Sequence, residues 1–230
     1  MKRVKLFLTV IVLMQAAFVQ SQVDLQNTGT LFITGGSDIL YINGALTNTV
    51  SGALTNNGSL YVRQNLTSGQ AAMPVGTGTL YLNGTSAQIV GGTQPFRTFN
   101  LVTNNAAGIT LNANLSVSGA HTFTSGVIAT SVTPNYLIYE AGSSHSGSAD
   151  SRHVNGWVKK IGNSNFTFPV GNGTFLRNTA ISNLSASSEF NCKFFLVTPN
   201  PTNILAPILL VDNNEYWDIT RVSGGTADIT

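Results

Sequence analysis

The sequence predicts an all-β fold: a parallel β-solenoid (β-helix) with coils of about 20 residues, followed by an antiparallel β-sandwich-like domain. The first observation is a Leu-Tyr-apolar triplet that occurs three times at one constant step, starting at Leu40. The second is that short apolar triplets alternate with Gly and Asn, whereas helical spacing of apolar residues is confined to the N-terminus. The third is that only Arg63 and Arg97 are charged in residues 39–139.

The N-terminal residues have the features of an export signal. A basic start, MKRVK, precedes a continuous apolar stretch at residues 6–19, and small or neutral residues follow it. The apolar stretch is shorter than the roughly 20 residues that a membrane helix needs. We interpret residues 1–21 as a signal peptide cleaved near Ser21, and we expect a secreted or cell-surface protein. An uncleaved N-terminal anchor is the alternative.

The charge of the mature chain differs from that of the full chain, which has 11 Lys and Arg against 9 Asp and Glu. Three basic residues lie in the predicted signal, which leaves 8 basic against 9 acidic residues and a net charge of −1. No basic run remains, so the electrostatic signature of a nucleic-acid-binding protein is missing. No later apolar stretch is long enough for a membrane span. We therefore expect neither nucleic acid as a partner nor a membrane span in the mature chain.

Cys192 is the only cysteine, so an intramolecular disulfide cannot form. The chain is long enough to be stabilised by its own core without such a bond. Cys192 lies in the apolar segment FNCKFFLV, which favours a small buried side chain over a catalytic thiol.

Residues 22–149 are expected to form the solenoid. In such a fold, identical side chains stack in ladders along each wall, because one coil cannot bury its own apolar edge. Leu and Ile of each triplet should point inward and the residue between them outward. Gly and Asn suit the corners, because they tolerate unusual backbone angles or bond their own backbone. A β-sandwich whose hairpins repeat by chance is the competing interpretation.

Residues 150–230 break the rhythm of the repeat. Longer alternating strands and prolines at turns indicate a sandwich-like domain. It would cap the solenoid, whose open end would otherwise expose strand edges and apolar side chains. The last residues, ADIT, read as the start of a further strand. We therefore expect this domain to be incomplete and the reading frame to continue beyond Thr230.

The candidate ligand-binding residues are the three tyrosines of the repeat, Tyr41, Tyr61 and Tyr81. If they face outward, they form an aromatic ladder that can stack on sugar rings, because an aromatic face combines apolar area with a polar group. Ordinary strand tyrosines that cover the wall are the alternative.

No motif predicts catalysis, a cofactor or a metal. Residues 141–150 contain serines and His145, but they lack the Gly-x-Ser-x-Gly frame and the following helix of a nucleophile elbow, so we interpret them as a solvated linker. His121 is expected on an outward wall position. The acidic residues within 212–218 lack the glycine and alternating oxygen ligands of a calcium loop. We therefore expect no catalytic, cofactor-binding or metal-binding residue.

Several motifs resemble secreted surface proteins of the Bacteroidota type. The matching segments are residues 78–84 (GTLYLNG), 88–92, 99–130, 154–160, 168–171 (FPVG) and 216–219 (YWDI). The resemblance implies a stalk, adhesin or matrix component exported by type IX secretion. The sorting domain that this route reads is not among the 230 residues.

The function expected from these observations is that of a non-catalytic structural or adhesive repeat protein at the cell surface. Its partners would be a surface polysaccharide or the extracellular matrix. The alternative is a carbohydrate-binding or carbohydrate-active β-helix protein of the lyase or hydrolase kind. Glycoside hydrolysis requires paired carboxylates, and residues 39–139 contain none.

Overall fold

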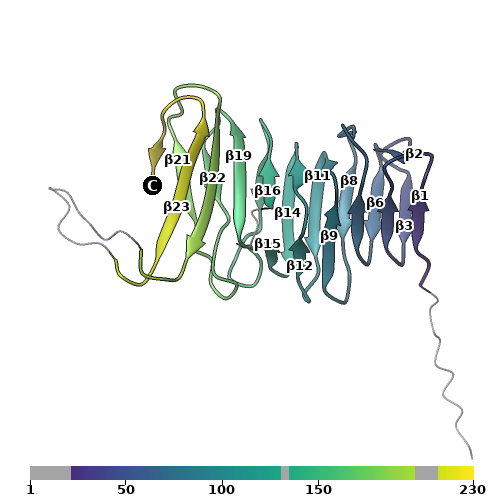
Figure 1. Cartoon of the computed structure of the whole chain (residues 1–230), viewed down its shortest axis with the longest axis horizontal. Helices are drawn as coiled ribbons and strands as arrows, with labels where there is room; N and C mark the ends of the chain where they lie inside the picture. Colours follow the sequence, from purple (N-terminus) through teal and green to yellow (C-terminus); the bar gives the residue numbers. More distant parts are fainter. Residues whose placement is uncertain (1–21, 131–134, 200–211) are drawn as a thin grey trace, which may run out of the picture.

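The computed structural model describes residues 22–130, 135–199 and 212–230, and within them the chain forms strands and turns without a helix. The strands stack along one long axis, from β1 (Leu25–Asn27) at one end to the C-terminal strands at the other (Figure 1). This arrangement confirms the prediction of an all-β fold that begins as a parallel solenoid.

Three sheets form the walls of the solenoid. The long wall contains, in spatial order, β1, β4 (Leu46–Asn48), β7 (Leu66–Ser68), β9 (Gln88–Gly92), β12 (Ile109–Leu111), β15 (Ile128–Thr130) and β18 (Val154–Asn155). The tyrosine wall contains β17 (Ser144–Ser146), β14 (Ala120–Ser125), β11 (Asn100–Asn104), β8 (Thr79–Leu82), β6 (Ser59–Val62) and β3 (Ile39–Ile42). The mixed wall contains β10 (Phe96–Thr98), β13 (Leu115–Val117), β16 (Tyr136–Tyr139), β19 (Trp157–Gly162), β22 (Ser188–Phe195) and β23 (Tyr216–Ser223). Two small sheets complete the fold: β2 (Thr30–Ile33) with β5 (Ala53–Asn56), and β20 (Phe166–Phe168) with β21 (Thr179–Ser182) and β24 (Asp228–Ile229).

The register predicted from the repeat is confirmed on the tyrosine wall. Leu60 pairs with Leu40 on one side and with Leu80 on the other, and all three strands run parallel. The sequence separation between paired residues is larger in some later coils, where Leu80 pairs with Leu101 and His121 pairs with His145. The walls do not keep one unbroken register: Thr103 pairs with Phe123 but Asn104 pairs with Ser125, so β14 holds one extra residue at that point.

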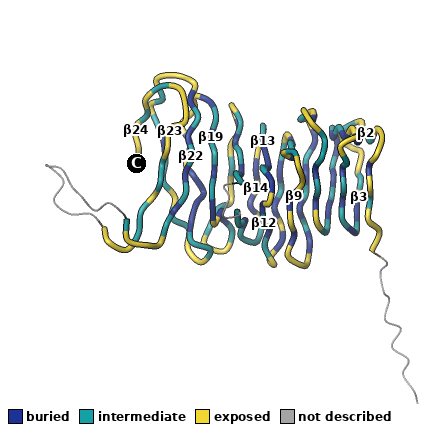
Figure 2. Tube along the Cα trace, viewed as in Figure 1, coloured by how far each residue is buried: buried dark blue, intermediate teal, exposed yellow. Residues whose placement is uncertain are grey.

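The core follows from the alternation of each strand. In β6, Leu60 and Val62 are fully buried, whereas Ser59 and Tyr61 on the other face are half-buried. The same pattern recurs from wall to wall, and buried segments follow the whole axis in Figure 2. The inward side chains join a single apolar cluster that extends from the first coils to β22.

The corners require particular residues. Asn27 Nδ2 donates to Asn48 Oδ1 of the next coil at 2.8 Å, so these buried amides satisfy one another in a ladder. At another corner, Gly126 has a φ of +84°, and a Cβ atom there would lie 1.7 Å from the carbonyl oxygen of Asn105. Only glycine fits this position, because it combines a left-handed backbone with a contact that leaves no room for a side chain.

The change from parallel to antiparallel pairing takes place at β19. This strand pairs in parallel with β16 and antiparallel with β22. Parallel pairing therefore continues to Lys160, beyond the boundary expected between residues 149 and 150. Buried Phe168 and Ile181 of the small sheet join the same core as Cys192 of β22, and these antiparallel strands close the C-terminal end of the solenoid. The expected burial of Cys192 is confirmed.

Candidate functional site

The three tyrosines of the repeat lie in register on the outer face of the tyrosine wall. The rings of Tyr61 and Tyr81 are parallel within 7° and their centroids are 4.1 Å apart, so each covers one face of the other. Tyr41 is tilted by 37° from Tyr61 at 5.7 Å, and 53% of its surface is exposed. A ligand-stacking role for the three rings stays a prediction, and this geometry makes Tyr41 the ring best placed for it.

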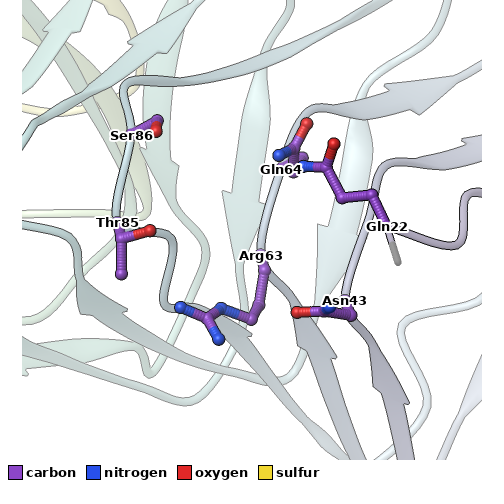
Figure 3. A pocket seen from close by; sticks show the side chains of 6 residues that line it. All are labelled: Gln22, Asn43, Arg63, Gln64, Thr85 and Ser86. Atoms are coloured by element: carbon purple, nitrogen blue, oxygen red, sulfur yellow. The ribbon is translucent and has the colours of Figure 1, made fainter. Parts of the chain in front are cut away.

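A polar pocket of about 220 Å³ lies at the corner that follows these strands. Its walls come from successive coils, because each coil turns at the same corner after its tyrosine strand (Figure 3). It is lined by Gln22, Asn43, Arg63, Gln64, Thr85 and Ser86. In Figure 3 the Arg63 side chain lies between Asn43 and Thr85, and it brings the only charge among side chains that are otherwise amides and hydroxyls.

Arg63 connects this pocket with the ladder. Its Nη1 atom donates a hydrogen bond to the Tyr41 hydroxyl at 3.3 Å. Within the described residues the ion pairs are Lys159–Glu189 and Arg177–Glu215, so Arg63 has no carboxylate partner there. The guanidinium therefore carries an unmatched positive charge beside a half-exposed aromatic ring.

A second aromatic row was missed by sequence reasoning. On the outer face of the mixed wall, Trp157 lies 6.1 Å from both Tyr136 and Phe195, and Phe195 stacks on Tyr216 at 4.9 Å. The Lys193 ammonium lies 4.5 Å from the Phe195 ring centroid, a cation–π contact. The sequence signal was the alternation in EFNCKFF, but the row depends on the strand reversal at β22 and has no fixed period.

His121 is fully buried, so its predicted outward position is wrong. It pairs in register with Leu101, which points into the core, and it therefore takes the inward side of β14. Its Nδ1 lies 2.7 Å from the Tyr139 hydroxyl and its Nε2 lies 3.1 Å from Thr103 Oγ1. Burial lowers the pKa of His121 well below its usual value, and the nearby His145 lowers it further, so the ring is neutral and bonded to two hydroxyls.

Lys160 is the most deeply buried cation described, with 1% of its surface exposed. Its ammonium donates to the carbonyl oxygens of Glu140 at 2.8 Å and Ser143 at 3.2 Å. Burial lowers the pKa of Lys160 to about 8, against a smaller opposing effect of the Glu140 charge. The Glu140 carboxylate itself accepts from Ser116 Oγ at 2.6 Å.

The serine-rich segment 141–150 is not the solvated linker expected from the sequence. Its residues Ser144–Ser146 form β17, the last strand of the tyrosine wall. His145 Nε2 lies 2.6 Å from the Thr167 carbonyl oxygen, and Asp150 accepts from the Leu176 amide at 2.9 Å. These two groups thus bond to separate backbone partners, and the structure does not join them in a relay.

The acidic residues near the C-terminus also accept hydrogen bonds from separate partners. Asp212 accepts from the Asn214 amide at 2.7 Å, and Asp218 accepts from Thr220 Oγ1 at 2.8 Å. Among residues 22–130, 135–199 and 212–230, no group of three or more His, Cys, Asp or Glu side chains is placed to hold a metal ion. In the same ranges, no helix is long and apolar enough to cross a membrane.

The fold defines the chain as a parallel β-solenoid protein with an antiparallel C-terminal end. No protein-family model matches the chain, and neither a curated protein nor a solved structure is significantly similar to it. The fold by itself does not define a function, which depends on the chemistry of the walls and of the pocket.

Proposed function

We propose that the protein is a secreted or cell-surface repeat protein that acts in structure or adhesion and not in catalysis. The observation that supports this proposal is the pairing of the solenoid walls, in which parallel strands stack in register around one apolar core. Such a body is rigid and elongated, and each coil contacts mainly its neighbours. The resemblance to exported surface proteins points in the same direction.

The distribution of carboxylates supports a non-catalytic role. Glycosidases need two carboxyl groups roughly 5–9.5 Å apart on either side of the scissile bond. The sequence contains no carboxylate in residues 39–139, which form most of the solenoid walls. Glu140, which follows this segment, is bonded to Ser116.

The test is an activity assay on the purified protein without its predicted signal. Pectin, alginate and chitin are incubated with it, and reducing ends and the absorbance of unsaturated products are measured. We expect no turnover. Turnover that persists through purification and is lost in Glu140→Gln or Asp150→Asn would refute the proposal.

A second candidate function is carbohydrate binding without cleavage. The observation that favours it is the pocket of Arg63 beside the exposed ring of Tyr41. Binding of this kind is compatible with adhesion, since an adhesive surface protein needs a ligand site.

A further inference from the structure

We infer that the Arg63 pocket at the corner of the tyrosine wall binds a carboxylate-bearing sugar residue of an acidic polysaccharide. This inference rests on the proposed adhesive function, for which it names a ligand class and a site. The chemistry follows from three features: an unmatched guanidinium, a polar lining and an adjacent aromatic ring.

The guanidinium selects for an anion. Arginine presents five N–H donors in a planar fork that matches a carboxylate with two parallel hydrogen bonds. Within the described residues, the hydrogen bond of the Arg63 side chain is to the neutral Tyr41 hydroxyl, and Arg63 takes part in no ion pair. Charge-assisted hydrogen bonds to a carboxylate are about twice as strong as neutral ones, so an acidic ligand gains more from this site than a neutral one.

The surroundings favour the entry of an acidic group. The first described carboxylate of the chain, Asp24, accepts a hydrogen bond from the Ala45 amide at 2.8 Å, and it is not paired with Arg63. Asp38, which directly precedes the first tyrosine strand, accepts hydrogen bonds from the Thr34 hydroxyl and the Gly35 amide, and residues 39–139 carry no acidic residue. An incoming polyanion therefore meets little repulsion along this wall, and its charge complements that of Arg63.

The rest of the pocket fits a sugar better than a simple anion. The amides of Asn43 and Gln64 and the hydroxyls of Thr85 and Ser86 each supply hydrogen-bond donors and acceptors, as the hydroxyl groups of a sugar require. The Tyr41 hydroxyl is hydrogen-bonded to Arg63, and the half-exposed ring of Tyr41 offers apolar area next to the guanidinium. At about 220 Å³ the pocket is smaller than a typical drug-sized site, so it suits one sugar residue of a longer chain.

The test compares two ligands that share one sugar backbone and differ in charge. Oligogalacturonate and its methyl ester have the same sugar backbone, but the ester has no carboxylate. In titration calorimetry of the protein without its predicted signal, we expect the acid to bind at least tenfold more tightly than the ester. Added salt should weaken the binding of the acid and leave that of the ester unchanged.

The variants locate the site. Arg63→Gln removes the charge but keeps a planar amide, and we expect it to weaken binding of the acid by tenfold or more. Arg97→Gln is the matched control, because Arg97 is the other charged residue of the segment 39–139 and also hydrogen-bonds a neutral oxygen, the Met73 carbonyl at 3.3 Å. It should bind like the wild type. If Arg63→Gln alters thermal melting, Arg63→Lys replaces it and must keep the preference for the acid.

Different results would overturn the binding inference and the proposed non-catalytic function. Equal binding of acid and ester, no binding of either, or equal losses in Arg63→Gln and Arg97→Gln overturn the inference. Binding of inorganic phosphate as tightly as oligogalacturonate also overturns it, because the pocket would then be a simple anion site. Cleavage of the oligomer, measured in the same samples, would refute the proposed non-catalytic function without affecting the binding result.

Discussion

Lys160 allows a quantitative test of the interior of the fold. Its ammonium is buried and bonds to carbonyl oxygens of Glu140 and Ser143. The pKa of Lys160 is about 8 in the folded protein, against an ordinary value of 10.5. The folded state therefore loses this proton at lower pH than the unfolded state. Between pH 8 and pH 10.5 the unfolded chain binds more protons at this lysine than the folded protein does, so the free energy of unfolding must rise with pH.

The size of the effect follows from the pKa. One pKa unit corresponds to about 1.36 kcal/mol, so the folded-state deprotonation of Lys160 should raise the free energy of unfolding by about 1.4 kcal/mol between pH 7 and pH 9. Cys192 acts in the opposite sense at higher pH. Burial raises the pKa of its thiol, so the folded state keeps a proton that the unfolded chain loses near pH 9. A comparison with a variant at Lys160 cancels this opposing effect.

The assay is urea unfolding at pH 7, 8 and 9, followed by tryptophan fluorescence, for the wild type and Lys160→Met. Methionine has a similar shape and cannot titrate. The difference in unfolding free energy between the two proteins should change by about 1.4 kcal/mol over this range, in favour of the wild type as the pH rises. A difference that stays constant would show that Lys160 keeps its proton on folding, and the reasoning from its burial would then be wrong.

Two further predictions concern the stacked walls. Leu60→Asp should unfold the solenoid, because it buries an unpaired carboxylate at a cost of several kcal/mol, whereas Tyr61→Asp on the outer face should cost roughly 1 kcal/mol. Equal losses in thermal melts followed by circular dichroism would contradict the inward and outward assignment. Gly126→Ala should destabilise the protein by more than about 1 kcal/mol, because its Cβ would clash with Asn105 in a left-handed turn. Gly29→Ala, which meets no atom within 4 Å, should leave the melting temperature nearly unchanged and serves as the control.

The strict repeat made part of the fold predictable. Around Leu60 three signals agree: the constant step between triplets, the alternation of apolar and polar positions, and the Gly and Asn corners. Each signal is local or periodic, so a single sequence carries it. The orientation of Tyr61 and the pairing with Leu40 and Leu80 follow from them.

Beyond the strict 20-residue repeat, the sequence does not determine which face of a strand points into the core. In WVKKIG, the face with Trp157 and Ile161 is the more apolar one, yet Val158 and Lys160 point inward. The register of β19 decides this, because Val158 pairs with the buried Leu137 of the preceding coil. His121 was misassigned for the same reason, since its partner in the previous coil determines its side of the strand.

The Arg63 pocket could be predicted only in part. The sequence indicates that Arg63 is an isolated charge, but the corner residues Asn43 and Thr85 come together only through stacking of three coils. Their positions in the corners depend on turn geometry rather than on strand alternation. The exposure of the Tyr41 ring likewise depends on the position of its strand, β3, at the edge of the tyrosine wall.

The repeated step on the tyrosine wall also makes the molecule adjustable in length. Leu40, Leu60 and Leu80 occupy equivalent places, so duplication of one coil in this region would bury the same kind of side chains against the same kind of neighbours. Each added coil would extend the reach by about one strand spacing, roughly 4.8 Å. A coil inserted next to β19 would not be equivalent to its neighbours, because β19 pairs with a parallel strand on one edge and with an antiparallel strand on the other. Genetic variation in reach should therefore accumulate among the early coils, while the reversal point stays constant.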